Sequence, residues 1–285
     1  MRSERRSLRA ADFDEIHRAF VEAFSDYVVP MKPAPEALRE MFTRRGWVPE
    51  LSSGVFEKKR LVAFTINGLD GTTGYDTGSG VIPSHRRRGL ARQTMEHSVE
   101  LLRKAGATRY VLEVLEPNVA AAALYQDVGF TETRRLDCWT LEVPSALRGE
   151  ARVRGGARAT VPFVAASQAS PLPEGAKELS WWDVQPSWQN STASILRARD
   201  RYVVLGDDDS YAIVFPATGD VPQFAVRREA RRRGLGTRLL QDAAATAGKP
   251  LRILNVDARQ EGMAAFLAAL GAQRFVRQIE MERFL

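Results

Sequence analysis

The chain has 285 residues, a net charge of +6 and a hydrophobic fraction of 44%, values typical of one large or two medium-sized globular domains. A single cysteine, Cys138, excludes an intramolecular disulfide and a multi-cysteine metal site. The first nine residues lack the apolar stretch of a signal peptide, and no apolar run is long enough to span a membrane. We therefore expect a cytoplasmic protein without membrane contact. The spacing of His, Cys and carboxylate residues predicts no metal site.

The first half alternates between helical and strand periodicity. In chain order, the pattern predicts a helix capped by Asp12 or Asp14 and ended by residues 25–30, a helix at 35–45, a hairpin of strands 51–57 and 61–67, a strand at 74–82, a helix starting near Gly89, a strand at 110–115, a helix at 118–126, and closing strands at 130–133 and 138–143.

The stretch 146–175 is rich in Arg, Gly, Ala, Ser and Pro, and it lacks sustained periodicity, so we predict a linker in which 159–165 could form a strand. Domains are then expected at 1–145 and 176–285. The second half repeats the order of the first. Its predicted elements are a strand at 179–184, a helix at 186–197, strands at 201–205, 211–215 and 224–226, a helix at 238–247, a strand at 251–256, a helix at 261–270 and a strand pair at 274–284.

The turn between the strand 74–82 and the following helix has a composition suited to binding an anion. A helix N-terminus offers unpaired N–H groups and a positive dipole end, and Gly89 lets the backbone approach a phosphate closely. Small Ala91 keeps the turn open, and the arginines can add charge-assisted hydrogen bonds. The turn Arg86-Arg87-Arg88-Gly89-Leu90-Ala91 recurs as Arg231-Arg232-Arg233-Gly234-Leu235-Gly236. Both turns therefore indicate a pyrophosphate cradle, once in each half.

With these turns, both halves resemble the GNAT superfamily of N-acetyltransferases, whose acetyl-CoA site carries Arg/Gln-x-x-Gly-x-Gly/Ala between a strand and a helix. Asn118, Tyr125 and Gly129-Phe130 resemble the family's later motif. The resemblance implies an α/β (α+β) fold of two tandem mixed-sheet domains, each with a splayed central strand pair that admits acetyl-CoA. It also implies which residues contact this co-substrate: Val81, Ile82, Arg86, Arg87, Arg88, Gly89, Leu90, Ala91 and Asn118.

The resemblance implies catalytic roles in the first half only. Tyr125 is the candidate general acid for the CoA thiolate, whereas Leu267 takes its place in the second half. Asp76 is a candidate base on the strand that enters the turn, Glu113 is another on the next strand, and deprotonation through water is a third alternative. The second half then supports the first, or it binds CoA without turnover.

The predicted function is acetyl transfer from acetyl-CoA to a primary amine of a small molecule, by direct attack on the thioester. Alternatives are a protein or peptide amine as acceptor and a catalytically silent CoA-binding or regulatory protein. A nucleic-acid site at Arg227-Arg228 and Arg231-Arg232-Arg233 is disfavoured, because these arginines lie where a cofactor phosphate is expected. The residues do not distinguish among amine acceptors, and both a monomer and a homodimer fit them.

Overall fold

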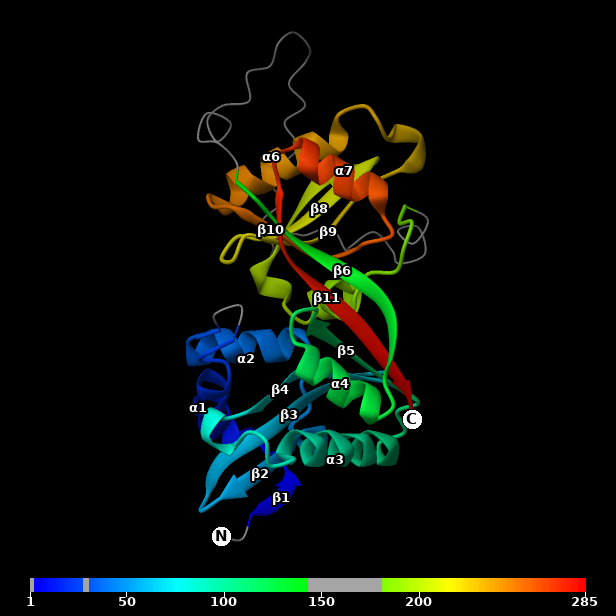
Figure 1. The fold of residues 1–285 in the computed structure, drawn as a ribbon. Coiled ribbons are helices and arrows are strands. Elements are labelled where there is room, and N and C mark those ends of the chain that lie inside the picture. Colours follow the sequence, from blue (N-terminus) through cyan, green and yellow to red (C-terminus); the bar gives the residue numbers. More distant parts are fainter. Residues whose placement is uncertain (1–2, 28–30, 143–180) are drawn as a thin grey trace. The chain divides into compact units, whose positions relative to one another are not determined.

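A computed structural model describes residues 3–27, 31–142 and 181–285 (Figure 1). The predicted linker 146–175, with its strand at 159–165, lies outside these described residues. The chain forms two compact units: Met1–Thr133 with Ile279–Leu285, and Arg134–Gln278. Across the described ranges, every helix is too short or too polar to span a membrane. The domain boundaries at 145 and 176 stay a prediction, and the compact units group the chain differently, since the last seven residues belong to the first unit.

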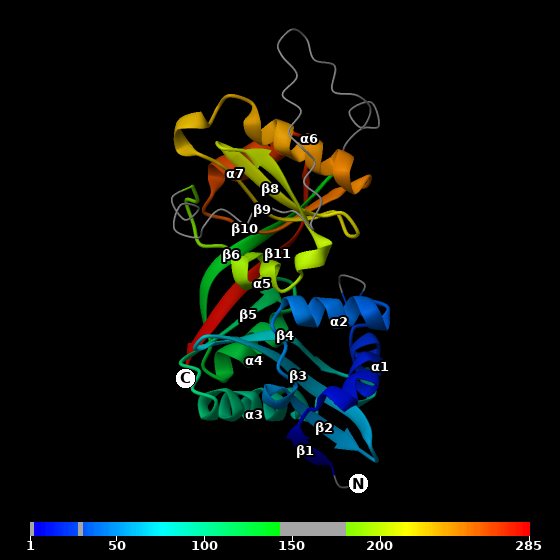
Figure 2. The same ribbon diagram turned by 180° about the vertical axis from the view of Figure 1, so that it is seen from behind.

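The first unit is a mixed sheet with helices on both faces (Figures 1 and 2). Its strands lie in the order β1-β2-β3-β4-β5, followed by the end of β11. In chain order the elements are β1 (Glu4–Ser7), α1 (Phe13–Ala23), α2 (Pro35–Arg44), β2 (Ser53–Glu57), β3 (Arg60–Asp70), β4 (Thr73–Val81), α3 (Leu90–Lys104), β5 (Arg109–Leu115), α4 (Val119–Asp127) and β11 (Gln273–Phe284). These bounds confirm the predicted helices and the hairpin over Lys58 and Lys59, whose positive φ angles are those of a tight hairpin turn.

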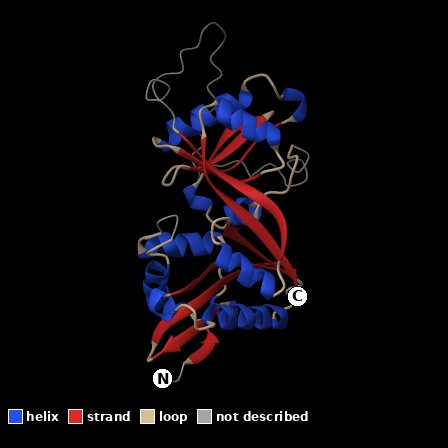
Figure 3. Ribbon diagram, viewed as in Figure 1, coloured by secondary structure: helices blue, strands red, loops and turns tan. Residues whose placement is uncertain are grey.

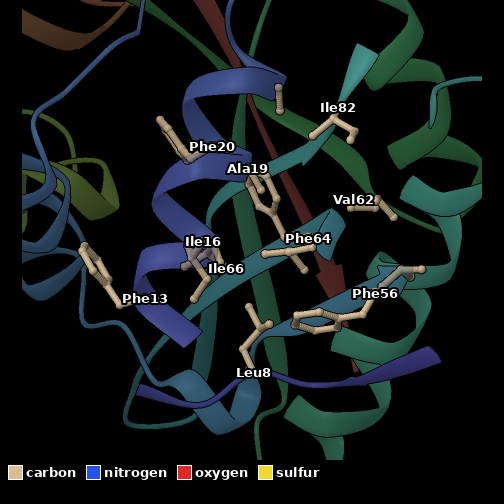
Figure 4. Packing of buried hydrophobic residues seen from close by; sticks show 14 of the residues in the cluster. Leu8, Phe13, Ile16, Ala19, Phe20, Phe56, Val62, Phe64, Ile66 and Ile82 are labelled. Atoms are coloured by element: carbon tan, nitrogen blue, oxygen red, sulfur yellow. The ribbon is translucent and has the colours of Figure 1, made fainter. Parts of the chain in front are cut away.

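Each face of this sheet carries its own core. On one face, Ile16, Ala19 and Phe20 of α1 pack against Phe64 and Ile66 of β3 (Figure 4). The opposite face is covered by α3 and α4, and its buried cluster includes Met95, Leu102, Tyr110, Tyr125 and Met281. The alternation of side chains along the strands thus assigns each strand residue to the α1/α2 face or to the α3/α4 face.

The two central parallel strands of the first unit, β4 and β5, are paired at their start and diverge toward their ends. β4 pairs with β3 as far as Val81, but it pairs with β5 only from Thr73 to Asp76, which lies opposite Leu112. Beyond that point, the end of β4 and the end of β5 have no register with each other. This is the splayed central pair that the sequence predicted.

The second unit repeats this plan with less helix at its start (Figure 3). Its sheet order is β6-β10-β9-β8-β7, with the start of β11 beside β6. The elements are β6 (Thr131–Leu141, of which the first three residues belong to the first unit), α5 (Thr192–Leu196), β7 (Val203–Asp207), β8 (Ser210–Phe215), β9 (Asp220–Val226), α6 (Leu235–Ala247), β10 (Leu251–Asp257), α7 (Glu261–Ala269) and β11.

Two predicted strand pairs are wrong, because residues 131–141 and 273–284 each form one continuous strand. Charged residues of these strands are neutralised within the sheet. Asp137 is almost fully buried, and its carboxylate accepts hydrogen bonds from Arg277 at 2.7 and 3.0 Å. Strand β1 was not predicted, since its sequence is almost entirely polar.

The opening of the second unit also differs from its prediction. Residues 181–184 form a turn rather than a strand, because the Trp181 carbonyl and the Asp183 carboxylate bind Arg231. The predicted helix 186–197 is shorter: a 3-10 turn, Trp188–Asn190, precedes α5. At the start of α5, the Ser194 N–H donates to the hydroxyl of the N-cap residue Ser191 at 3.2 Å.

Candidate active site

The turn after β4 has the backbone shape of an anion cradle. Arg87 and Gly89 have φ angles of 65° and 72°, and Gly89 is the N-cap residue of α3. A Cβ added at Gly89 would meet nothing within 4 Å, so the approach to the first turn of α3 is open. The turn and Leu124 of α4 line a hollow of about 240 Å³. The unpaired N–H groups of a helix N-terminus can bind a phosphate in such a hollow.

The three arginines of this turn have different surroundings. Arg86 donates to both carboxylate oxygens of Asp26 at 2.7 Å and to the Ala23 carbonyl at 3.0 Å, so it ties the turn to the end of α1. The hydrogen bond from Arg86 lowers the pKa of Asp26. Arg88 donates to Glu57 at 2.6 Å. Within the described residues, Arg87 has no such partner, and it remains available to a ligand.

The second turn repeats this geometry. Arg232 and Gly234 have φ angles of 65° and 84°, and Arg231 donates to Asp183 at 2.8 Å and to the Trp181 carbonyl at 2.7 Å. Arg86 and Arg231 thus make the same kinds of contact, each to one carboxylate and to a main-chain carbonyl shortly before it. A role that recurs in both copies indicates that the first arginine of each turn shapes the backbone.

Ile82 has its main-chain groups engaged within the protein. Its N–H donates to the Val62 carbonyl at 3.0 Å, its carbonyl accepts from His85 at 2.9 Å, and its side chain is fully buried. Val81 lines the hollow and its carbonyl accepts from Arg86 at 3.3 Å. Of the residues predicted to contact acetyl-CoA, Val81, Arg86, Arg87, Gly89, Leu90 and Ala91 thus line one hollow, and Ile82 lies behind it.

Asp76 lies on the α3/α4 face, at the last paired position before β4 and β5 diverge. Ile66 of β3 lies opposite Gly78, and Asn67 lies opposite Asp76, so Thr77 is the extra residue of a β-bulge. Because of this bulge, Ser79 shares a face with Asp76, and its hydroxyl donates to the carboxylate at 2.7 Å. The Gly78 N–H also donates to Asp76, at 2.9 Å. Burial nevertheless dominates and raises the pKa of Asp76 to about 6.

Tyr125 of α4 is buried on the same face, where its ring packs edge-on against Phe130. Burial raises the pKa of the Tyr125 phenol well above its ordinary value, and the charge of Asp76 raises it further. Asn118 is the N-cap residue of α4: its side-chain oxygen accepts from Ala121 at 3.3 Å, and its amide donates to the Tyr27 hydroxyl at 3.4 Å. The structure therefore brings Asp76, Ser79, Asn118 and Tyr125 to one part of the first unit.

Glu113 lies on the opposite face. Tyr110, Leu112 and Val114 belong to the α3/α4 core, so Glu113, between two of them, faces α1 and α2. It is half-buried, it is the first residue of β5 after the paired segment, and it accepts a hydrogen bond from the buried Tyr75 hydroxyl. The two candidate bases are thus separated by the sheet, with Asp76 near Tyr125 and Glu113 on the other side.

Sequence reasoning missed Ser79 and Tyr75. Ser79 was hidden because a regular strand would place it on the face opposite Asp76, and only the bulge brings the two together. The signal for the bulge was present in Gly78-Ser79-Gly80, since glycine in a strand often marks a bulge or a close backbone approach.

The raised pKa of Asp76 predicts a pH-dependent cost to stability. Below its ordinary value of 3.8, the carboxyl is protonated in both states and contributes nothing; between that value and about 6, only the unfolded chain ionises, so stability falls as pH rises. Asp76→Asn keeps an acceptor for Gly78 and a polar partner for Ser79 and removes this cost. We expect the free energy of unfolding of Asp76→Asn, measured in urea, to exceed that of the wild type by near zero at about pH 4 and by roughly 3 kcal/mol above about pH 7. An advantage that does not change with pH would contradict this prediction.

The model of the acetyltransferase (GNAT) family matches residues 13–130 and 178–272. The [ribosomal protein bS18]-alanine N-acetyltransferase of Escherichia coli (strain K12) is 39% identical over 75 residues, which are 26% of this chain and 49% of that protein. The chain thus spans about half the length of this relative. N-alpha-acetyltransferase 30 of Schizosaccharomyces pombe is 30% identical over 105 residues, which are 35% of this chain and 70% of that enzyme.

Two solved structures share the fold over nearly the whole chain. A tandem GNAT protein from the clavulanic acid biosynthesis pathway has a TM-score of 0.65 at 19% identity, and 99% of this chain and 98% of that chain are covered. A GCN5-related N-acetyltransferase from Sphaerobacter thermophilus has a TM-score of 0.69 at 15% identity, covering 99% and 95% of the two chains. The family model covers most of the sequence in two copies, and the chain belongs to the acetyltransferase (GNAT) family as a tandem member.

Proposed function

We propose that the first unit transfers an acetyl group from acetyl-CoA to a primary amine. The observation that carries this proposal is the adjacency of three features: an open phosphate-binding turn at Gly89, a gap between β4 and β5, and the buried Tyr125 phenol beside that gap. Acetyl-CoA supplies an activated thioester carbon, and the protein must then bind a diphosphate, orient the thioester and manage two protons.

The diphosphate is proposed to bind at the first turn of α3. The N–H groups of Leu90 and Ala91 are free of intrahelical partners by the geometry of a helix start, and Arg87 provides a nearby cation. Arg86 and Arg88 act indirectly, by holding the turn through Asp26 and Glu57. The hollow beside Val81 and Leu124 fits the start of the extended pantetheine arm.

Tyr125 is proposed as the general acid. A phenol is protonated at neutral pH, so Tyr125 can donate a proton to a leaving thiolate, and burial and the Asp76 charge raise its pKa further. Asp76 then acts on Tyr125 through its charge, and Ser79 fixes the position of the Asp76 carboxylate. We place Asp76 as a positioning residue in this proposal.

Glu113 is proposed as the group that receives the proton of the amine. It lies on the α1/α2 face, where the strand ends part, and the β4 glycines on that face are closely packed: a Cβ at Gly78 would lie 3.3 Å from Phe20. The Tyr75 hydroxyl holds the carboxylate in place. We propose that the amine reaches the gap between the strands from this side, where the Glu113 carboxylate lies.

The acceptor predicted from the sequence is a small-molecule amine, and it stays a proposal. An N-terminal α-amine of a protein or peptide is the second candidate, because the matched relatives from Escherichia coli and Schizosaccharomyces pombe are named for that kind of acceptor.

Tyr125→Phe tests the acid. Removing one hydroxyl from a buried ring should leave the fold and the KM for acetyl-CoA nearly unchanged and lower kcat on the order of 10²-fold, the usual scale for a lost general acid. The measurement is steady-state release of the CoA thiol, with the melting temperature as the folding control. Turnover equal to that of the wild type would remove Tyr125 from this role.

Glu113→Gln and Asp76→Asn form a matched pair of variants that distinguishes the proposed roles of the two carboxyl groups. In Glu113→Gln, the new amide oxygen still accepts from Tyr75 but takes up no proton, so kcat/KM should fall on the order of 10²-fold and recover as pH rises and more free amine forms. Asp76→Asn should cost less than about tenfold. A larger loss for Asp76→Asn than for Glu113→Gln would reverse the assignment.

An acceptor panel tests the reaction itself. Wild-type protein is assayed for CoA release with small primary amines and with a short peptide bearing a free α-amine, and the same peptide with a blocked N-terminus is the control. We expect at least one small amine to match or exceed the free peptide in kcat/KM. An advantage of the peptide of about tenfold or more would favour the second candidate. No release with any amine would overturn the proposed function.

A further inference from the structure

The second unit contains the same bulge and the same turn as the first, which lets its residues be matched one by one. Ile213 of β8 lies opposite Gln223, and Phe215 lies opposite Asp220, so β9 carries its extra residue at the position of Thr77. The turns match over Arg231 to Gly236, and Gly271 matches Gly129 in the later helix. On this alignment, residues on both sides of the second strand gap can be compared with those of the first.

On the turn side of the gap, larger apolar side chains replace the polar site. Phe224 takes the place of Ser79, Val221 that of Asp76, and Leu267 that of Tyr125. The rings of Phe224 and Phe266 lie 6.2 Å apart between centroids, and both pack into the core of the unit. Phe266 takes the place of Leu124, which lines the open hollow of the first unit.

The same ring also covers the base of the second turn. A Cβ added at Gly236 would lie 3.2 Å from the Phe266 ring, whereas the first unit holds Ala91 and its open hollow there. The space that would take the start of a pantetheine arm is therefore filled by Phe224 and Phe266.

On the other side of the gap, a polar bridge joins the two parted strands. β9 and β10 share a single register pair, Asp220 with Arg252, and then diverge. Gln223 of β9 donates to the Asn190 carbonyl at 2.6 Å, and the Asn190 amide donates to the Leu254 carbonyl of β10 at 2.7 Å. Both bridging side chains are buried. Gln223 stands where the first unit has Gly78, and Leu254 stands where it has Glu113.

We infer that the cofactor cleft of the second unit is closed on both faces by its own side chains, so that each chain binds one acetyl-CoA, at the Gly89 turn. The inference rests on the proposed use of acetyl-CoA by the first unit. The Arg231–Gly236 turn keeps its shape because Arg231 and Asp183 hold it, but it no longer opens onto a slot. The residues of the second unit that correspond to the site of the first unit thus pack its core.

The first experiment measures where CoA binds on the full chain. Calorimetric titration with CoA should give one equivalent, and hydrogen exchange should show protection at 86–92 and none at 231–237. A second equivalent, or protection at 231–237, would overturn the inference. Binding at neither turn would instead overturn the proposed function, while agreeing with a closed second cleft.

A matched pair of variants checks the same point by mutation. Gly89 and Gly234 both have positive φ angles and no atom within 4 Å of an added Cβ, so Gly89→Val and Gly234→Val impose comparable backbone strain. Gly89→Val should weaken CoA binding about tenfold or more, and Gly234→Val should leave affinity and stoichiometry unchanged within about twofold. Comparable melting temperatures control for folding. Loss of CoA affinity in Gly234→Val would contradict the closed cleft.

A reopening variant tests which side chains close the turn side. Phe224→Ser combined with Phe266→Leu restores the residues that the first unit has at these positions. We expect new CoA-dependent protection at 231–237, with an affinity about tenfold or more below that of the first turn, because the Asn190 bridge remains. Unchanged exchange at 231–237 in a folded double variant would show that these rings are not the closure.

Discussion

The parting of β4 and β5 after Asp76 is the constraint on which the first unit depends. A parallel pair that stayed bonded to its end would leave no gap in the sheet and no route from one face to the other. The bulge at Thr77 occurs at this point, so one irregularity both ends the pairing and changes which side chains share a face. Without the bulge, Ser79 would lie on the α1/α2 face, and the Asp76 carboxylate would lose its strongest local donor.

The sheet also separates two kinds of chemistry. On the α3/α4 face, burial raises the pKa of the Tyr125 phenol and the pKa of the Asp76 carboxyl. On the α1/α2 face, a half-buried carboxylate accepts a hydrogen bond from the Tyr75 hydroxyl. A reaction that needs an acid and a base at once gains from this separation, because two groups in direct contact would exchange the proton with each other.

Much of this arrangement could be predicted from the sequence, because local patterns report local structure. The helices of the first unit, the hairpin at Lys58-Lys59 and both Arg-Gly turns follow from apolar periodicity and glycine placement. The continuity of β6 and β11 was not predicted, since Asp137 finds its partner Arg277 140 residues away and no local pattern records that. The contact between Arg86 and Asp26 was also out of reach, because a guanidinium that binds a carboxylate and one that binds a phosphate look alike in a sequence.

The duplication has diverged by substitution at a few matched positions. The backbone of the second turn is retained to within a few degrees at Arg232, yet Ser79, Asp76 and Tyr125 have apolar counterparts. Burying apolar surface stabilises a fold, whereas a buried carboxyl with a raised pKa costs stability at neutral pH. A second unit that no longer catalyses a reaction can therefore gain stability when apolar side chains fill its cleft.

The assignment of Ile279–Leu285 to the first unit bears on how the protein is made. Met281 is buried in the core that also holds Tyr125, and the Leu285 N–H donates to the Thr108 carbonyl at 3.0 Å. A ribosome that has translated residues 1–145 has thus not yet supplied every strand of the unit that contains Tyr125. The second unit, by contrast, has all of its residues as soon as Gln278 is added. During synthesis, the half of the chain translated first is the half that can be completed last.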